Sequence, residues 1–124
     1  MTPLLFLPGM MCDARLFAPQ MAALSAQRMV ACAALTTHDT MEALAAEVLA
    51  KAPARFALAG LSMGGILAME MLRQAPERVA GLALLDTNPL AEREEVKAAR
   101  GPQIDTVKAG HLGDLMQELM IPNY

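Results

Sequence analysis

The chain has no tryptophan and few aromatic residues of any kind, with one tyrosine and three phenylalanines among 124 residues. It is also poor in charge, since 19% of its residues are charged and the net charge is −3. Its Lys and Arg residues are scattered, so the sequence lacks the basic patch that binding to a phosphate backbone requires. We therefore expect no nucleic-acid partner.

Cysteine is scarce as well. The two cysteines, Cys12 and Cys32, have neither the spacing of zinc ligands nor the density of a disulfide scaffold. This pattern predicts two free thiols in a reducing compartment, and hence a cytoplasmic location.

Long hydrophobic runs are missing. The longest apolar stretch, residues 56–69, contains glycines and is shorter than the ~20 residues that a membrane-spanning helix needs. At the N-terminus, Pro3 and Pro8 interrupt a short apolar run that has no positively charged flank or small-residue cleavage site. We expect neither a membrane span nor a signal peptide.

Hydrophobic residues nevertheless make up 55% of the chain, in short runs separated by amphipathic segments. Four runs are typical of buried strands, at residues 4–7, 29–35, 56–61 and 79–85. Helices are expected around Pro19, at 41–52 after an N-cap at Asp39, and at 63–73. Strands that alternate with helices at this spacing predict an α/β fold with a parallel sheet covered on both faces.

The pattern changes after Pro89. A cluster of charged residues occupies 92–97, a helical stretch runs over 112–120, and Gly101-Pro102 is interpreted as a break between the last two helices. We therefore divide the chain into a core at 1–89 and a helical segment at 90–124.

A GxSxG sequence, Gly60-Leu61-Ser62-Met63-Gly64, lies between the third predicted strand and the helix after it. A strand that turns at once into a helix strains its corner residue, and glycines two positions before and after the corner avoid a collision. The turn would expose the Ser62 hydroxyl beyond the carboxyl end of the sheet, beside a helix N-terminus. Ser62 is the candidate nucleophile, and the alternative is a structural serine in a glycine-rich turn.

Acyl transfer also needs N–H donors for an oxyanion. The residue after the nucleophile, Met63, would supply one from its backbone. The loop after the first strand, Leu7-Pro8-Gly9-Met10, would supply the other from Met10, unless it is an ordinary strand-ending turn. The Met10, Met11 and Met63 side chains would line an acyl pocket or fill the core.

These segments, together with Arg78-Val79 through Leu84-Leu85-Asp86, resemble the start of the α/β-hydrolase superfamily, in particular its small bacterial esterase, lactonase and carboxylesterase-like members. The family's usual His-Gly before the oxyanion residue is Pro8-Gly9 here. The resemblance implies an α/β-hydrolase core in 1–89 and the start of a helical lid in 90–124. It also implies that the C-terminal strands of the complete enzyme are missing from this chain.

In this family the triad runs Ser, then Asp or Glu, then His. Asp86, directly after the fourth predicted strand, is the candidate acid, although Asp86-Thr87-Asn88-Pro89 is also an ordinary turn sequence. His111 is the one histidine after Ser62, but it falls in the lid segment and is interpreted as a capping or solvated residue. Two further residues, His38 and Asp13, are interpreted as structural, with Asp13 in a turn or helix cap.

The predicted function is hydrolysis of a small carboxylic ester or lactone through an acyl-Ser62 intermediate, without a metal or organic cofactor. Thioesterases, acyltransferases, carbon–carbon hydrolases and cofactor-free haloperoxidases use similar elbows, and the fold does not choose among them. The alternative from another class is a catalytically incomplete fragment or association module that lacks the triad histidine. Its last strand would be open on one side and would favour pairing with a second copy as a homodimer.

Overall fold

The structure, a computed structural model, describes residues 1–123 of the chain. The chain forms two compact units, Met1–Pro89 and Leu90–Tyr124. None of the helices within the described residues combines the length and apolar character that crossing a membrane requires.

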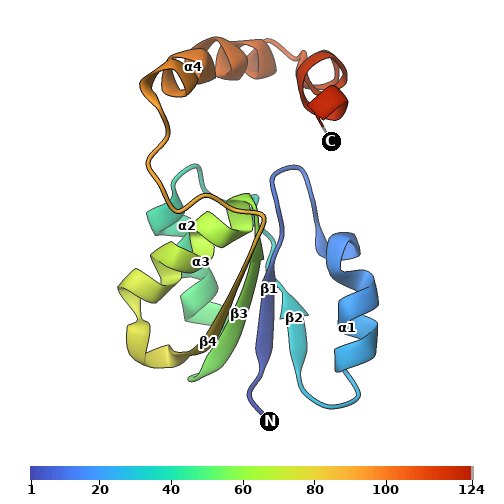
Figure 1. The fold of residues 1–124 in the computed structure, drawn as a ribbon, viewed down its shortest axis with the longest axis vertical. Coiled ribbons are helices and arrows are strands. Elements are labelled where there is room, and N and C mark those ends of the chain that lie inside the picture. The colour runs from blue at the N-terminus through green and yellow to red at the C-terminus, as the bar shows by residue number, and fades with distance from the viewer. Residues whose placement is uncertain (124) are drawn as a thin grey trace. The chain divides into compact units, whose positions relative to one another are not determined.

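The first unit is built on a parallel sheet of four strands in the order β2-β1-β3-β4 (Figure 1). Its strands are β1 (Leu4–Leu7), β2 (Val30–Cys32), β3 (Phe56–Leu61) and β4 (Val79–Leu85). The predicted α/β class and the bounds of β1, β3 and β4 are confirmed. The second strand is shorter than the predicted 29–35, because it lies at the edge of the sheet and pairs only with the four-residue β1.

Helices cover both faces of this sheet (Figure 1). One face carries α2 (Met41–Lys51) and α3 (Met63–Gln74), which bury the larger core cluster against Leu5, Leu7 and Phe56. The other face carries η1 (Ala14–Phe17) and α1 (Ala18–Leu24), where Phe17 stacks on Phe6 with ring centroids 4.6 Å apart. A short turn, η2 (Pro76–Arg78), leads from α3 into β4. Successive side chains of β1 thus enter opposite cores, as the alternation of a strand requires.

Helix α2 begins one residue later than the predicted cap implies. Thr40, rather than Asp39, is the N-cap, and its Oγ1 accepts a hydrogen bond from the Ala43 N–H at 3.3 Å. Both residue types cap helices well, so the position of the first helical turn decides between them. The expectation for Asp39 is therefore wrong by one position.

The second unit is helical in the residues that the structure describes. It contains α4 (Glu94–Lys108), α5 (Leu112–Leu115), a π-helical turn η3 (Met116–Met120) and a 3-10 turn η4 (Ile121–Asn123). The predicted break at Gly101-Pro102 is wrong, because α4 continues through it. Part of the clash that disfavours helical angles before a proline involves the Cβ of the preceding residue, which Gly101 does not have.

Candidate active site

Strand β3 runs directly into α3 at Ser62, which is the corner residue of the turn. Ser62 has φ 52° and ψ −115°, in the region that disfavours side chains, and its hydroxyl makes no capping hydrogen bond within the turn. The Met63 N–H is one of the first amides of α3 and has no partner within the helix. The GxSxG sequence thus occupies the strand–turn–helix setting that it predicts.

Both motif positions require glycine, because an added Cβ would lie closer to neighbouring backbone atoms than van der Waals contact allows. A Cβ on Gly60 would lie 2.3 Å from the Gly64 carbonyl oxygen. A Cβ on Gly64 would lie 2.0 Å from the Leu7 carbonyl oxygen. The first contact closes the turn on itself, and the second presses the start of α3 against the end of β1. No other residue fits at either position without moving backbone.

The loop after β1 passes beside the candidate nucleophile. A Cβ built on Gly9 would lie 3.8 Å from the Ser62 Cβ. The loop turns back through a hydrogen bond from the Cys12 N–H to the Gly9 carbonyl at 3.2 Å, and Met11 adopts φ 62°. Met10 and Met11 are 38% and 58% exposed, so their side chains do not fill the core. The loop that contains Met10 therefore borders Ser62.

Strained backbone gathers at one end of the sheet. In residues 1–123, the non-glycine residues with positive φ are Met11, Ser62 and Asp86. They follow β1, β3 and β4, which are neighbours in the sheet and whose carboxyl ends meet at the same edge. Strain of this kind costs about 1–3 kcal/mol per residue and clusters where proteins bind or react. The carboxyl edge of β1, β3 and β4 is therefore the candidate active site.

The loop after β4 meets the elbow directly. Leu85 accepts a hydrogen bond from the Ser62 N–H at 2.9 Å, and the Thr87 hydroxyl donates to the Ser62 carbonyl at 2.7 Å. Asp86 lies between these two residues, is exposed, and has φ 43°. Sequence reasoning considered Asp86 and missed Thr87. The signal that could have found Thr87 is Gly65, a third glycine with no role in the motif itself.

The contacts that each histidine makes within its own unit do not involve the elbow. His38 contacts Glu47 at 3.2 Å in the segment after β2, and β1 separates β2 from β3. His111 precedes α5 without making a capping hydrogen bond, and its Nδ1 lies 3.3 Å from Asp114 of the second unit. Asp13 caps η1 by accepting from the Arg15 N–H at 3.0 Å, so that prediction is confirmed. The first unit, whose single histidine is His38, thus gives Ser62 no imidazole.

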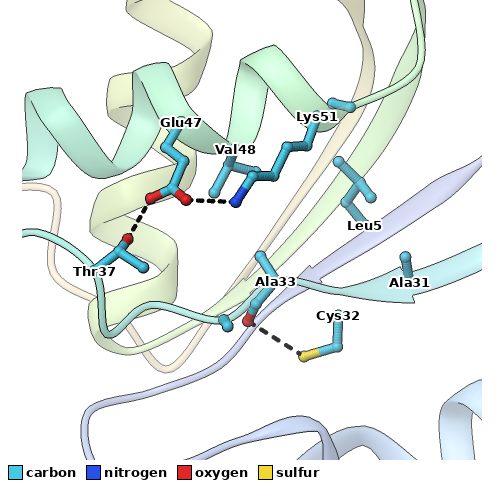
Figure 2. A pocket seen from close by; sticks show the side chains of 10 residues that line it. Leu5, Ala31, Cys32, Ala33, Thr37, Glu47, Val48 and Lys51 are labelled. Atoms are coloured by element: carbon cyan, nitrogen blue, oxygen red, sulfur yellow. Dashed lines mark hydrogen bonds and ion pairs between the residues drawn. The ribbon is translucent and has the colours of Figure 1, made fainter.

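A cavity of about 330 Å³ lies between β2 and α2, and Ser62 is not among the residues that line it (Figure 2). In Figure 2, Glu47 points toward both Thr37 and Lys51, and hydrogen bonds from Lys51 and then Thr37 lower the pKa of its carboxyl. Cys32 is also among the residues that line the cavity, and burial and then the Asp13 charge raise the pKa of its thiol, which makes it a poorer nucleophile. Across the described part of the chain, no three His, Cys, Asp or Glu side chains are grouped as metal ligands would be.

Solved structures place this fold in the α/β-hydrolase class. The chain is 27% identical to a thermophilic esterase from Thermogutta terrifontis, with a TM-score of 0.82 over 98% of this chain and 50% of the esterase. It is 15% identical to a carboxylesterase of Nitrososphaera gargenis, with a TM-score of 0.78 over 94% of this chain and 48% of the other. It is also similar to the thioesterase domain of the curacin biosynthetic pathway, at 19% identity and a TM-score of 0.66, over 95% of this chain and 53% of that domain.

The family model of the thioesterase domain matches residues 2–120. The chain therefore belongs to the thioesterase-domain family, which is a family of α/β-hydrolases. No protein with a curated description matches it. The chain spans about half the length of each of these three solved structures.

Proposed function

We propose that this chain carries the nucleophile and oxyanion donors of a serine hydrolase that cleaves carboxylic esters through an acyl-Ser62 intermediate. The observation that carries the proposal is the backbone of Ser62, strained at φ 52° between β3 and the N-terminus of α3. The two glycines make room for this corner, and the corner exposes the Ser62 hydroxyl at the carboxyl edge of the sheet.

In the proposed acylation, the Ser62 Oγ forms a bond to the substrate carbonyl carbon while a general base takes the hydroxyl proton. The carbonyl oxygen becomes an oxyanion, held by the Met63 and Met10 N–H groups. The oxyanion collapses and breaks the bond to the leaving alcohol or thiol, which takes up the proton. Water then attacks the acyl group in the same way and releases the acid and the Ser62 hydroxyl.

The proposed general base is a histidine outside the first unit, and Asp86 is the candidate acid. His111 is the one histidine of the second unit, although its contact with Asp114 favours a structural role. Without a base, Ser62 is a weak nucleophile, and only oxyanion and binding effects would remain. Removing a base that acts on Ser62 should therefore abolish most of the reactivity.

For the substrate, we propose a small carboxylic ester or lactone, with an acyl thioester as the competing class. Similarity to the Thermogutta esterase supports the ester, and membership in the thioesterase-domain family supports the thioester. Both share the acyl-serine step and differ in the leaving group. A p-nitrophenyl butyrate and a butyryl thioester, compared at equal concentration, separate them by the ratio of kcat/KM.

The direct test is intact-mass labelling of the chain with a small alkyl fluorophosphonate, in which the Ser62 Oγ displaces fluoride from phosphorus. We expect one adduct, absent in Ser62→Ala and retained in Ser25→Ala, a matched variant of an exposed serine after α1. The same adduct in Ser62→Ala would overturn the assignment of the nucleophile. If labelling occurs, its loss in His111→Ala would identify the base.

A second candidate function is association through β4, and the observation that favours it is the exposure of that strand. Six of its seven residues, 80–85, are exposed, and within the sheet β4 pairs with β3 alone. The strand is apolar throughout, so a second copy of this chain offers it a matching edge. Light scattering after gel filtration would detect such a dimer, and Leu84→Lys should dissociate it, since Leu84 is 41% exposed in the single chain.

We also propose a cytoplasmic location. The support is chemical, since Cys12 and Cys32 are both free and Cys12 is exposed. Exposed thiols persist where glutathione and thioredoxin keep cysteines reduced. Fractionation of cells that express the tagged chain would test this.

A further inference from the structure

Both backbone polar groups of Ser62 are bound by the segment at the end of β4. The Ser62 N–H donates to the Leu85 carbonyl at 2.9 Å, and the Ser62 carbonyl accepts from the Thr87 hydroxyl at 2.7 Å. The same carbonyl accepts from Gly65 at 2.9 Å and from Ile66 at 3.3 Å in the first turn of α3. Of these bonds, only the one from Thr87 comes from a side chain, so it can be removed without changing the backbone.

The Thr87 side chain is held in place by the glycine that follows the elbow motif. A Cβ on Gly65 would lie 2.7 Å from each of the Thr87 atoms Cβ, Cγ2 and Oγ1. Thr87 is accordingly half-buried, while Asp86 and Asn88 on either side of it are exposed. Because threonine is branched at Cβ, packing against Gly65 restricts its χ1 and fixes the direction of its hydroxyl. The hydroxyl is thus preorganised to donate to Ser62.

The bond from Thr87 acts on a rigid unit. The Ser62 carbonyl and the Met63 N–H belong to one planar trans peptide group, so their directions are opposite and locked together. A group that holds the Ser62 oxygen therefore also aims the Met63 hydrogen. Met63 is the oxyanion donor of the proposed function, and the donor must point at the position where the negative charge develops.

We propose that Thr87 is a positioning residue for this site, which orients the Met63 N–H and maintains the strained backbone of Ser62 through its hydrogen bond to the Ser62 carbonyl. This inference rests on the proposed function of Ser62 as the nucleophile. Strained angles persist only where the surroundings over-determine them. Thr87 supplies that constraint from the loop after β4, and so couples this loop to the geometry of the elbow.

The test removes the Thr87 hydroxyl and leaves the backbone unchanged. Thr87→Val is compared with wild type, because valine keeps the branched shape of threonine and lacks its hydroxyl. Thr87→Ser keeps the hydroxyl and removes the methyl group. Thr87→Ala, compared with Thr87→Ser, repeats the comparison if the valine variant does not fold. Two quantities are measured on the full chain, namely the fluorophosphonate labelling rate of Ser62 per folded molecule and the ¹H–¹⁵N shift of the Met63 amide.

We expect Thr87→Val to be labelled roughly 10- to 100-fold more slowly than wild type, a smaller loss than the roughly 10²- to 10³-fold that follows deletion of an oxyanion donor. Thr87→Ser should stay within about threefold of wild type on the same grounds. The Met63 amide resonance should move in Thr87→Val and Thr87→Ala but not in Thr87→Ser. A role in stability alone would lower the unfolding midpoint and leave the labelling rate of the folded molecules unchanged, and that result would overturn the proposal.

The two proposals fail in different ways. If Ser62 of the wild-type chain is not labelled, this chain by itself does not activate the nucleophile, and the Met63 resonance alone decides on Thr87. A Met63 resonance that is the same in wild type, Thr87→Val and Thr87→Ala would refute the positioning role. Equal labelling of wild type and Thr87→Val would refute it while leaving Ser62 as the nucleophile.

Discussion

Gly64 lies so close to Leu7 that a Cβ on Gly64 would stand 2.0 Å from the Leu7 carbonyl oxygen. This contact joins the first turn of α3 to the end of β1, and therefore joins the elbow to the loop that carries Met10. The two candidate oxyanion donors, on segments more than fifty residues apart in the sequence, are brought to one edge of the sheet by this approach of backbone to backbone.

Gly64→Ala should disrupt the unit. The new methyl group meets the backbone of Leu7 and Pro8 rather than a flexible side chain, so the elbow and β1 must separate. We expect a loss of about 3 kcal/mol or more in the free energy of unfolding, measured by urea denaturation. Gly113→Ala is the matched control, because nothing lies within 4 Å of its Cβ position and the change should stay within about 1 kcal/mol. A Gly64→Ala protein as stable as wild type would contradict the packing described here.

At the position of the candidate nucleophile, glycine should give a more stable chain than alanine. Ser62 has φ 52° and ψ −115°, a conformation that costs a side-chain-bearing residue about 1–3 kcal/mol and costs glycine little. Ser62→Gly should therefore be more stable than Ser62→Ala by about 1 kcal/mol, despite the greater flexibility of glycine in the unfolded chain. Thermal and urea unfolding of the two variants measure the difference. Equal stabilities would mean that Ser62 is not strained.

The order of strands and helices could be predicted because it depends on local sequence. The runs Phe56–Leu61 and Val79–Leu85 are continuous and apolar, and the observed strands match them residue for residue. The elbow could be predicted as well, since a strand, a GxSxG sequence and a helix follow one another without a gap. Two local predictions were wrong. Asp39 and Thr40 are both good N-cap residues, and the sequence alone did not show that Thr40 caps α2. Gly101-Pro102 was expected to break a helix, but α4 continues through it.

Contacts between distant segments could not be predicted from local patterns. Thr87 and Ser62 are 25 residues apart, and their hydrogen bond depends on the pairing of β3 with β4. The same holds for Arg78, whose role is visible only once η2 is placed against the end of α2. Sequence reasoning noticed Arg78 through the family resemblance and assigned it no contact. Such residues become visible only through the tertiary structure.

Arg78 should prove hard to replace. Its guanidinium donates to the carbonyls of Leu49 and Ala52 at 3.0 Å each and to that of Pro53 at 2.7 Å, where α2 ends and helical carbonyls lack partners. Arg78→Ala should lower the free energy of unfolding by about 2–4 kcal/mol. Lysine cannot reproduce the fork of donors, so Arg78→Lys should recover less than half of the loss. Arg55→Lys, at an exposed arginine nearby, should change stability by at most about 0.5 kcal/mol.

Helix α3 carries a carboxylate whose titration should be visible in the stability of the fold. Hydrogen bonds from Arg73, and then from Gln74, lower the pKa of Glu70 from its ordinary value of 4.5 to about 2. Gln74 also donates to the Glu42 carbonyl at 3.1 Å, so this cluster contacts α2 as well. Because the pKa is lower in the folded state, the ionised form of Glu70 stabilises the fold.

That contribution should be complete above the unfolded pKa near 4.5 and should disappear as the pH falls through about 2. Glu70→Gln should therefore be less stable than wild type at pH 7, by an amount that shrinks between pH 4.5 and 2. Urea denaturation of both proteins over this range measures the difference. Arg73→Gln removes the pair from the other side and should show the same narrowing. A difference between wild type and Glu70→Gln that stays constant from pH 7 to 2 would show that Glu70 acts through packing rather than charge.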